Sequence, residues 1–75
     1  MGECIIPMRS RTEAEKGRRA AKNERILTAV VPVDPSITRH GCTVGLRVSC
    51  SHAAYLADMF DEYGIRHGEI IGRAL

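Results

Sequence analysis

The sequence predicts an α+β fold of one small domain. Two amphipathic segments carry helix-capping residues at their starts, and four short strand-like segments lie before, between and after them. The length of 75 residues suits a single domain over residues 1–75. The order β-α-β-β-α-β most often folds as a ferredoxin-like sandwich, an antiparallel sheet with two helices on one face. That motif implies the spatial strand order fourth-first-third-second.

The first strand and helix are indicated by an apolar run followed by a capping pattern. Residues Glu3–Met8 form the short apolar run. Ser10 and Glu13 fit a capping box, in which the serine hydroxyl accepts an amide hydrogen bond and the glutamate reaches back. We expect the helix to continue through Asn23 with small residues on one face, which permits close approach to a sheet. That face comprises Ala14, Gly17 and Ala21.

The two middle strands are predicted from β-branched and alternating residues. A β-branched run lies within residues 25–33, and Pro32 and Pro35 end it. After a loop over residues 34–41, apolar and polar residues alternate from Cys42 to Cys50, as in a half-buried strand.

The second helix begins after a serine and ends at a glycine. Ser49 or Ser51 can cap it. Gly64 fits a left-handed cap with Ile65 as its hydrophobic contact, and residues 67–73 form a short final strand. The apolar stripe of this helix comprises Ala53, Leu56, Ala57 and Phe60.

Composition restricts the possible partners. Hydrophobic residues make up 44% of the chain and aromatic residues only 4%, without tryptophan, so the core is aliphatic. A core this small favours self-association, and we expect a possible homodimer. The net charge of +2 and the lack of aromatic stacking residues do not favour nucleic-acid binding.

The chain start and the cysteine count favour a cytoplasmic, reduced protein. The first residues lack the pattern of a signal peptide, and no apolar run has membrane-spanning length. Three cysteines are an odd number without zinc-finger spacing, which argues against a secreted disulfide framework. Cys4 and Cys50 are expected to be core residues at the opposite end of the sheet from Cys42.

Cys42 is the candidate functional residue. It follows Arg39, His40 and Gly41, where a loop leads into a strand, and nearby positive charge favours the nucleophilic thiolate. The predicted topology brings the start of the first helix, this loop and the turn after the second helix to one edge. We therefore expect basic residues from three segments to surround Cys42 and to stabilise an anion. These residues are Arg9, Arg11, Arg39, His40, Arg66 and His67.

One combination of residues resembles a known family. Pro32, Pro35 and Ile37 precede Gly41-Cys42, and Leu46-Arg47 follow. In this pattern the chain resembles the sulfur/selenium carrier-like family of small bacterial domains. The family typically has glycine directly after the cysteine, where this chain has Thr43, with Gly45 two positions later.

The resemblance implies a carrier rather than an enzyme in the ordinary sense. Cys42 would be the carrier thiol, holding sulfur or selenium as a persulfide or selenopersulfide. The partners would be a donor protein such as a cysteine desulfurase and an acceptor protein. We expect no cofactor and no bound metal. The sequence shows no Ser-His-Asp set, paired carboxylates or phosphate loop.

Three alternatives remain open. Cys42 can instead be a buried residue at a strand end. The protein can be an interaction or regulatory module that dimerises or docks partners through an open sheet face containing Thr43, Gly45 and Arg47. A copper or zinc site can form from His40, Cys42 and His67. Cys42 and Cys50 cannot share one ion, because eight residues of strand separate them by about 26 Å.

Overall fold

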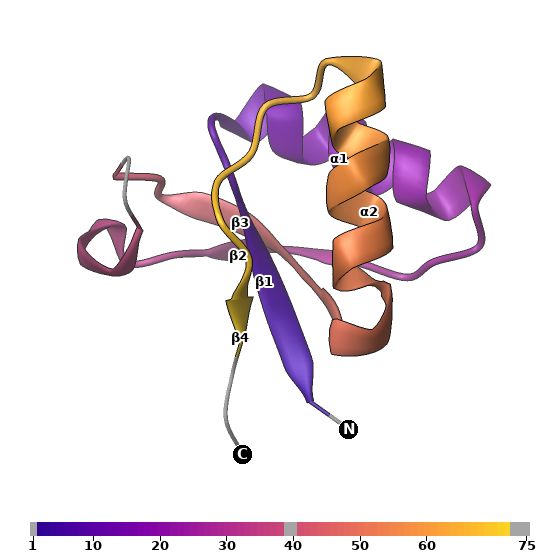
Figure 1. Cartoon of the computed structure of the whole chain (residues 1–75). Helices are drawn as coiled ribbons and strands as arrows, with labels where there is room; N and C mark the ends of the chain where they lie inside the picture. The colour runs from indigo at the N-terminus through magenta and orange to yellow at the C-terminus, as the bar shows by residue number, and fades with distance from the viewer. Residues whose placement is uncertain (1, 39–40, 73–75) are drawn as a thin grey trace.

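The computed structural model describes residues 2–38 and 41–72 and shows a small α+β structure with a four-stranded antiparallel sheet and two helices (Figure 1). The predicted fold class is confirmed at this level. In chain order the elements are β1 (Glu3–Met8), α1 (Arg11–Asn23), β2 (Ala29–Pro32), the 3₁₀ helix η1 (Pro35–Ile37), β3 (Val44–Ser49), α2 (Cys50–Tyr63) and β4 (Ile71–Gly72).

The sheet has the order β2-β3-β1-β4, and all neighbouring strands are antiparallel. β1 pairs with β3 along its whole length, from Glu3 opposite Ser49 to Met8 opposite Val44. On its other side β1 pairs with only the two residues of β4. Much of that edge of β1 is therefore open to other segments of the chain.

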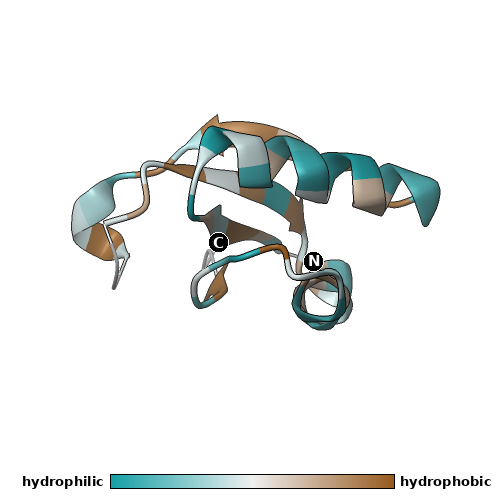
Figure 2. Cartoon of the chain, turned by 90° about the horizontal axis from the view of Figure 1, so that it is seen from above, coloured by the Kyte–Doolittle hydropathy of each residue, from teal (hydrophilic) through white to brown (hydrophobic). Residues whose placement is uncertain are grey.

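The core forms where both helices pack around the same side chains of the sheet. A Cβ added at Gly17 in α1 would lie 3.0 Å from Leu46 Cδ1 and Phe60 Cζ, and 3.2 Å from Met8 Cε. Leu46, Phe60 and Met8 come from β3, α2 and β1 and are fully buried. The predicted small-residue face of α1 and apolar stripe of α2 are both buried, as expected. Figure 2 shows that most of α1 is hydrophilic, consistent with one narrow buried face.

Only half of the predicted capping box is present at the start of α1. Ser10 caps the helix, and its Oγ accepts a hydrogen bond from Glu13 N at 3.1 Å. The Glu13 carboxylate does not reach back to Ser10. Its Oε2 accepts a hydrogen bond of 2.7 Å from the backbone N–H of Arg66. Glu13 therefore joins the start of α1 to the segment that follows α2.

The second strand begins later than predicted, because residues 25 and 26 complete the end of α1. Arg25 N donates to Lys22 O and Ile26 N donates to Ala21 O, both at 2.9 Å. This pair of bonds is a Schellman motif, which requires a left-handed residue after the cap, and Arg25 has φ 60°. α2 ends in the same motif with Gly64 at φ 70°, as predicted.

The boundaries of β3 also differ from the prediction. β3 starts at Val44, and Cys50 is the first residue of α2 rather than the last of the strand. The reason is that Ser49 caps α2, with its Oγ accepting from Ser51 N.

A β-bulge explains why β4 is shorter than predicted. His67 is bridged to Met8 and Ile71 is paired with Ile5, so residues 68–70 lie opposite only two residues of β1. The extra residue interrupts the ladder, as in a bulge. The segment still follows β1, since Gly68 N donates to Pro7 O at 2.7 Å.

The sheet face away from the helices is only partly open. Gly45 was expected to be exposed there, but it is buried, and its added Cβ would lie 2.8 Å from Ile5 Cγ2 and 2.9 Å from Val33 Cγ2. Arg47 is exposed and forms an ion pair of 3.7 Å with Glu3. The expectation of a wholly open face is therefore wrong near Gly45, because the side chains of Ile5 and Val33 cover it.

We predict that Arg25→Gly stabilises the protein by about 0.5–1 kcal/mol, because a left-handed residue with a Cβ is strained and glycine is not. Gly64→Ala at the matching position of α2 should destabilise it by about 1 kcal/mol. Urea unfolding monitored by circular dichroism measures both. A lower midpoint for Arg25→Gly would show that the Arg25 conformation carries no strain.

Candidate functional site

Cys42 lies in the loop between η1 and β3 and is only 5% exposed. It is also the one free cysteine, since Cys4 and Cys50 form a disulfide. The low exposure matches the alternative in which this residue is buried. Cys42 lies two residues before the first residue of β3, however, so a loop rather than the sheet ladder holds it.

Two side-chain caps build this loop. The Asp34 carboxylate accepts from Ser36 N at 2.9 Å and starts η1, and this hydrogen bond lowers the pKa of Asp34. Thr38 Oγ1 accepts from Cys42 N at 2.7 Å and lies within 3.2 Å of Pro35 O, to which it can donate. Thr38 therefore fixes the backbone of Cys42 to the end of η1.

The side chain of Cys42 contributes to a pocket with a volume of about 690 Å³. The bulged segment after α2 forms much of one wall, and Pro7 of β1 also lines the pocket. Ile37 and Ile70 contribute exposed apolar side chains, which are 56% and 37% exposed. The bulge thus borders a hollow of mixed apolar and polar lining beside Cys42.

His67 is the polar side chain best placed to act in this pocket. Its Nε2 lies 2.9 Å from Asp61 Oδ1, and its Nδ1 lies 2.8 Å from Gly68 O. Both partners are acceptors, so both contacts are hydrogen bonds only when both ring nitrogens carry protons. The ring also packs edge-on against Phe60, with centroids 6.1 Å apart. These contacts hold the His67 ring in one orientation beside the pocket that contains Cys42.

The other predicted basic residues are placed less closely around the thiol. Arg9, Arg11 and Arg66 are exposed, and none of them lines the pocket of Cys42. The hydrogen bond from Arg66 to Glu13 does show that the start of α1 and the turn after α2 meet, as the topology predicted. Arg39 and His40 lie outside the residues that the structure describes.

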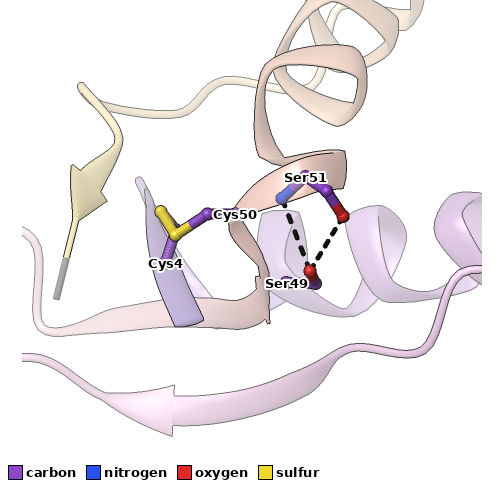
Figure 3. The surroundings of a disulfide bond; sticks show 4 residues. All are labelled: Cys4, Ser49, Cys50 and Ser51. Atoms are coloured by element: carbon purple, nitrogen blue, oxygen red, sulfur yellow. Dashed lines mark hydrogen bonds between the residues drawn. A yellow bond between two sulfur atoms is a disulfide. The ribbon is translucent and has the colours of Figure 1, made fainter. Parts of the chain in front are cut away.

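The disulfide lies at the other end of β1 (Figure 3). Cys4 is paired with Val48, four residues along β3 from Val44, which is the end near Cys42. The expectation that all three cysteines are reduced is wrong for Cys4 and Cys50, and Cys50 is exposed rather than a core residue. Because Cys50 starts α2 directly after β3, its Cα comes within 4.9 Å of Cys4 Cα.

The described part of the chain does not provide the ligands for a copper or zinc site. Among residues 2–38 and 41–72, no group of three or more His, Cys, Asp or Glu side chains is arranged to hold a metal ion. One residue of the proposed set, His40, lies outside these ranges. None of the described helices is long and apolar enough to cross a membrane.

Comparison of the chain with protein-family models, with curated proteins and with solved structures gives no match. The candidate site must therefore be interpreted from its own geometry.

We predict that Thr38→Val destabilises the protein by about 1–2 kcal/mol, because the N–H of Cys42 loses its acceptor. The same change should speed alkylation of Cys42, since the loop opens more often. Thr38→Ser keeps the hydroxyl and is the matched control. Equal alkylation rates in the wild type and both variants would mean that Thr38 does not control access to the thiol.

The Asp34 cap should also depend on pH. The pKa of Asp34 is lower in the folded chain than in the unfolded chain, so the stabilisation is complete above the ordinary carboxyl pKa. It is lost as the pH falls through the lowered, folded pKa. We expect the Ser36 amide resonance to shift over that acid range in an NMR titration. Asp34→Asn keeps an acceptor without titrating there, and an equal shift in this variant would contradict the prediction.

Proposed function

We propose that the protein is a sulfur or selenium carrier that holds the transferred atom on Cys42. The observation that best supports this function is the separation of the three cysteines into one free thiol and one disulfide. A persulfide is lost when a neighbouring thiol attacks it and forms a disulfide. With Cys4 and Cys50 bonded to each other at the far end of β1, Cys42 has no such competitor in its own chain.

The transfer step is a thiol exchange at sulfur. The thiolate of Cys42 attacks the terminal sulfur of a persulfide on a donor protein such as a cysteine desulfurase. A new S–S bond forms on Cys42, and the donor cysteine leaves as a thiolate. Attack by an acceptor on the terminal sulfur then regenerates the Cys42 thiolate. No cofactor or metal is needed for either step.

The pocket supports this chemistry, although the thiol is nearly buried. The terminal atom of a persulfide on Cys42 would occupy the hollow beside the bulge, where the N–H of His67 is a candidate hydrogen-bond donor. A donor must displace the loop that Thr38 holds, which limits exchange to a bound partner protein.

We further infer that the domain belongs with the sulfur/selenium carrier-like family and has the ferredoxin-like arrangement. The antiparallel sheet with a central β1, the two helices and the Gly41-Cys42 pair support this inference. A cytoplasmic location fits the proposed partners. In that compartment the Cys4–Cys50 disulfide would form reversibly. We do not propose a membrane or nucleic acid as a partner.

A second candidate function is an interaction module. In this function the domain forms a homodimer or binds another protein, and Cys42 takes no part. The exposed Ile37 and Ile70 favour it, because both line the same pocket and a partner that covers the pocket would bury both apolar side chains together. In that case Ile37→Ser would abolish association while Cys42→Ala would leave it intact.

The carrier function predicts a covalent product. Incubation with a cysteine desulfurase and cysteine should add the mass of one sulfur atom to the wild type. Cys42→Ala, which keeps the disulfide and the small buried side chain, should not gain it. Mass spectrometry of the intact protein under non-reducing conditions measures this. A wild type that stays unmodified, or a Cys42→Ala variant that is modified equally, would falsify the carrier function.

A further inference from the structure

The disulfide is asymmetric in its exposure. Cys4 lies near the start of the inner strand β1 and is 7% exposed, whereas Cys50 is exposed at the start of α2. Figure 3 shows the bond running from β1 to the first turn of the helix. Of the two bonded residues, Cys50 is therefore the one that solvent and an attacking thiol can approach more readily.

The first turn of α2 has features that suit a cysteine whose disulfide bond opens and forms again. Cys50 is its first residue, directly after the cap residue Ser49. The N-terminus of a helix stabilises a thiolate through the positive end of its dipole and its free N–H groups. Ser49 Oγ already accepts from Ser51 N and lies 2.9 Å from Ser51 Oγ, so the cap does not depend on the disulfide.

Other contacts hold α2 against β1 when the S–S bond is open. Cys50 N donates to Gly2 O at 3.1 Å, a backbone bond that needs no sulfur. Ala53 and Leu56 of α2 are 2% and 0% exposed and belong to the same core cluster as Ile6 of β1. The fold can therefore keep the two cysteines close together in the reduced state, ready to form the bond again.

We propose that Cys4 and Cys50 form a redox-active pair that exchanges with a dithiol reductant, with Cys50 as the entry sulfur. This site is separate from Cys42 and does not rest on the carrier function.

The exchange balances in two steps. The first thiolate of the dithiol attacks Cys50 Sγ, an S–S bond forms between them, and Cys4 leaves as a thiolate that takes up a proton. The second thiolate of the dithiol attacks the sulfur of the first and closes a disulfide in the reductant. Cys50 leaves as a thiolate stabilised by the helix terminus. Two electrons pass from the dithiol to the protein, whose two sulfurs become thiols.

Native reduction tests the proposal in a Cys42→Ala background, so that Cys4 and Cys50 are the only cysteines and failure of the carrier function has no effect. The oxidised, folded protein is treated with dithiothreitol without denaturant, and free thiols are trapped by alkylation. We expect both cysteines to be labelled while the circular dichroism spectrum stays that of the folded protein. Reduction that occurs only in denaturant would overturn the proposal, because the bond would then be purely structural.

The entry sulfur is tested with single-cysteine variants in the same background. Cys4→Ala leaves Cys50, and Cys50→Ala leaves Cys4. Cys50 should form a mixed disulfide with glutathione disulfide about tenfold faster than Cys4. Equal rates, or a faster Cys4, contradict entry at Cys50.

The intact pair decides the same point if either single-cysteine variant fails to fold. Excess reduced glutathione is added to the native disulfide form, and peptide mass spectrometry locates the first adduct. An adduct on Cys50 supports the proposal, and an adduct on Cys4 overturns it.

Discussion

The close contact at Gly17 is the constraint on which the rest of the structure depends. With no side chain there, α1 approaches Met8 of β1, Leu46 of β3 and Phe60 of α2 at once, and a Cβ would lie within 3.2 Å of all three. A chain with 4% aromatic residues has little bulk with which to fill a core, so it must bring backbones together instead. This contact fixes both helices on the same side chains of the sheet.

Once the helices are fixed, the edge of β1 determines the candidate site. The Glu13–Arg66 hydrogen bond holds the segment after α2 against the start of α1. That segment then runs beside β1, where three of its residues lie opposite only two residues of the strand. The bulge lies against Pro7, with Gly68 N donating to Pro7 O, and this segment lines the pocket together with Ile37, Thr38 and Cys42. The segment along this edge therefore supplies His67 and Ile70 to the pocket, and η1 supplies Ile37.

Periodicity and capping residues predicted the elements well, because each depends on local sequence. Ser10, Gly17 and Gly64 all have the roles expected of them. What could not be predicted is either a local conformation without its usual residue, as at Arg25, or a contact between distant segments. Arg25 takes a left-handed conformation that glycine usually occupies, and the helix end then delays β2.

The site was predicted only in part, for the same reason. Cys42 was identified from its neighbours in sequence, but its burial depends on Thr38 and on the bulge. The Cys4–Cys50 bond spans 46 residues, and no spacing pattern indicates it. Its one signal was the placement of both cysteines at the same end of the sheet, which follows from topology and not from local sequence.

The structure thus divides its sulfur chemistry between the two ends of β1, with a nearly buried free thiol at one end and a disulfide with one exposed partner at the other. Titration of thiols in protein purified without reductant tests this division most directly. The account predicts one titratable thiol in denaturant, located at Cys42 by peptide mapping, and three after reduction. Three thiols without reduction, or a disulfide that includes Cys42, would contradict it.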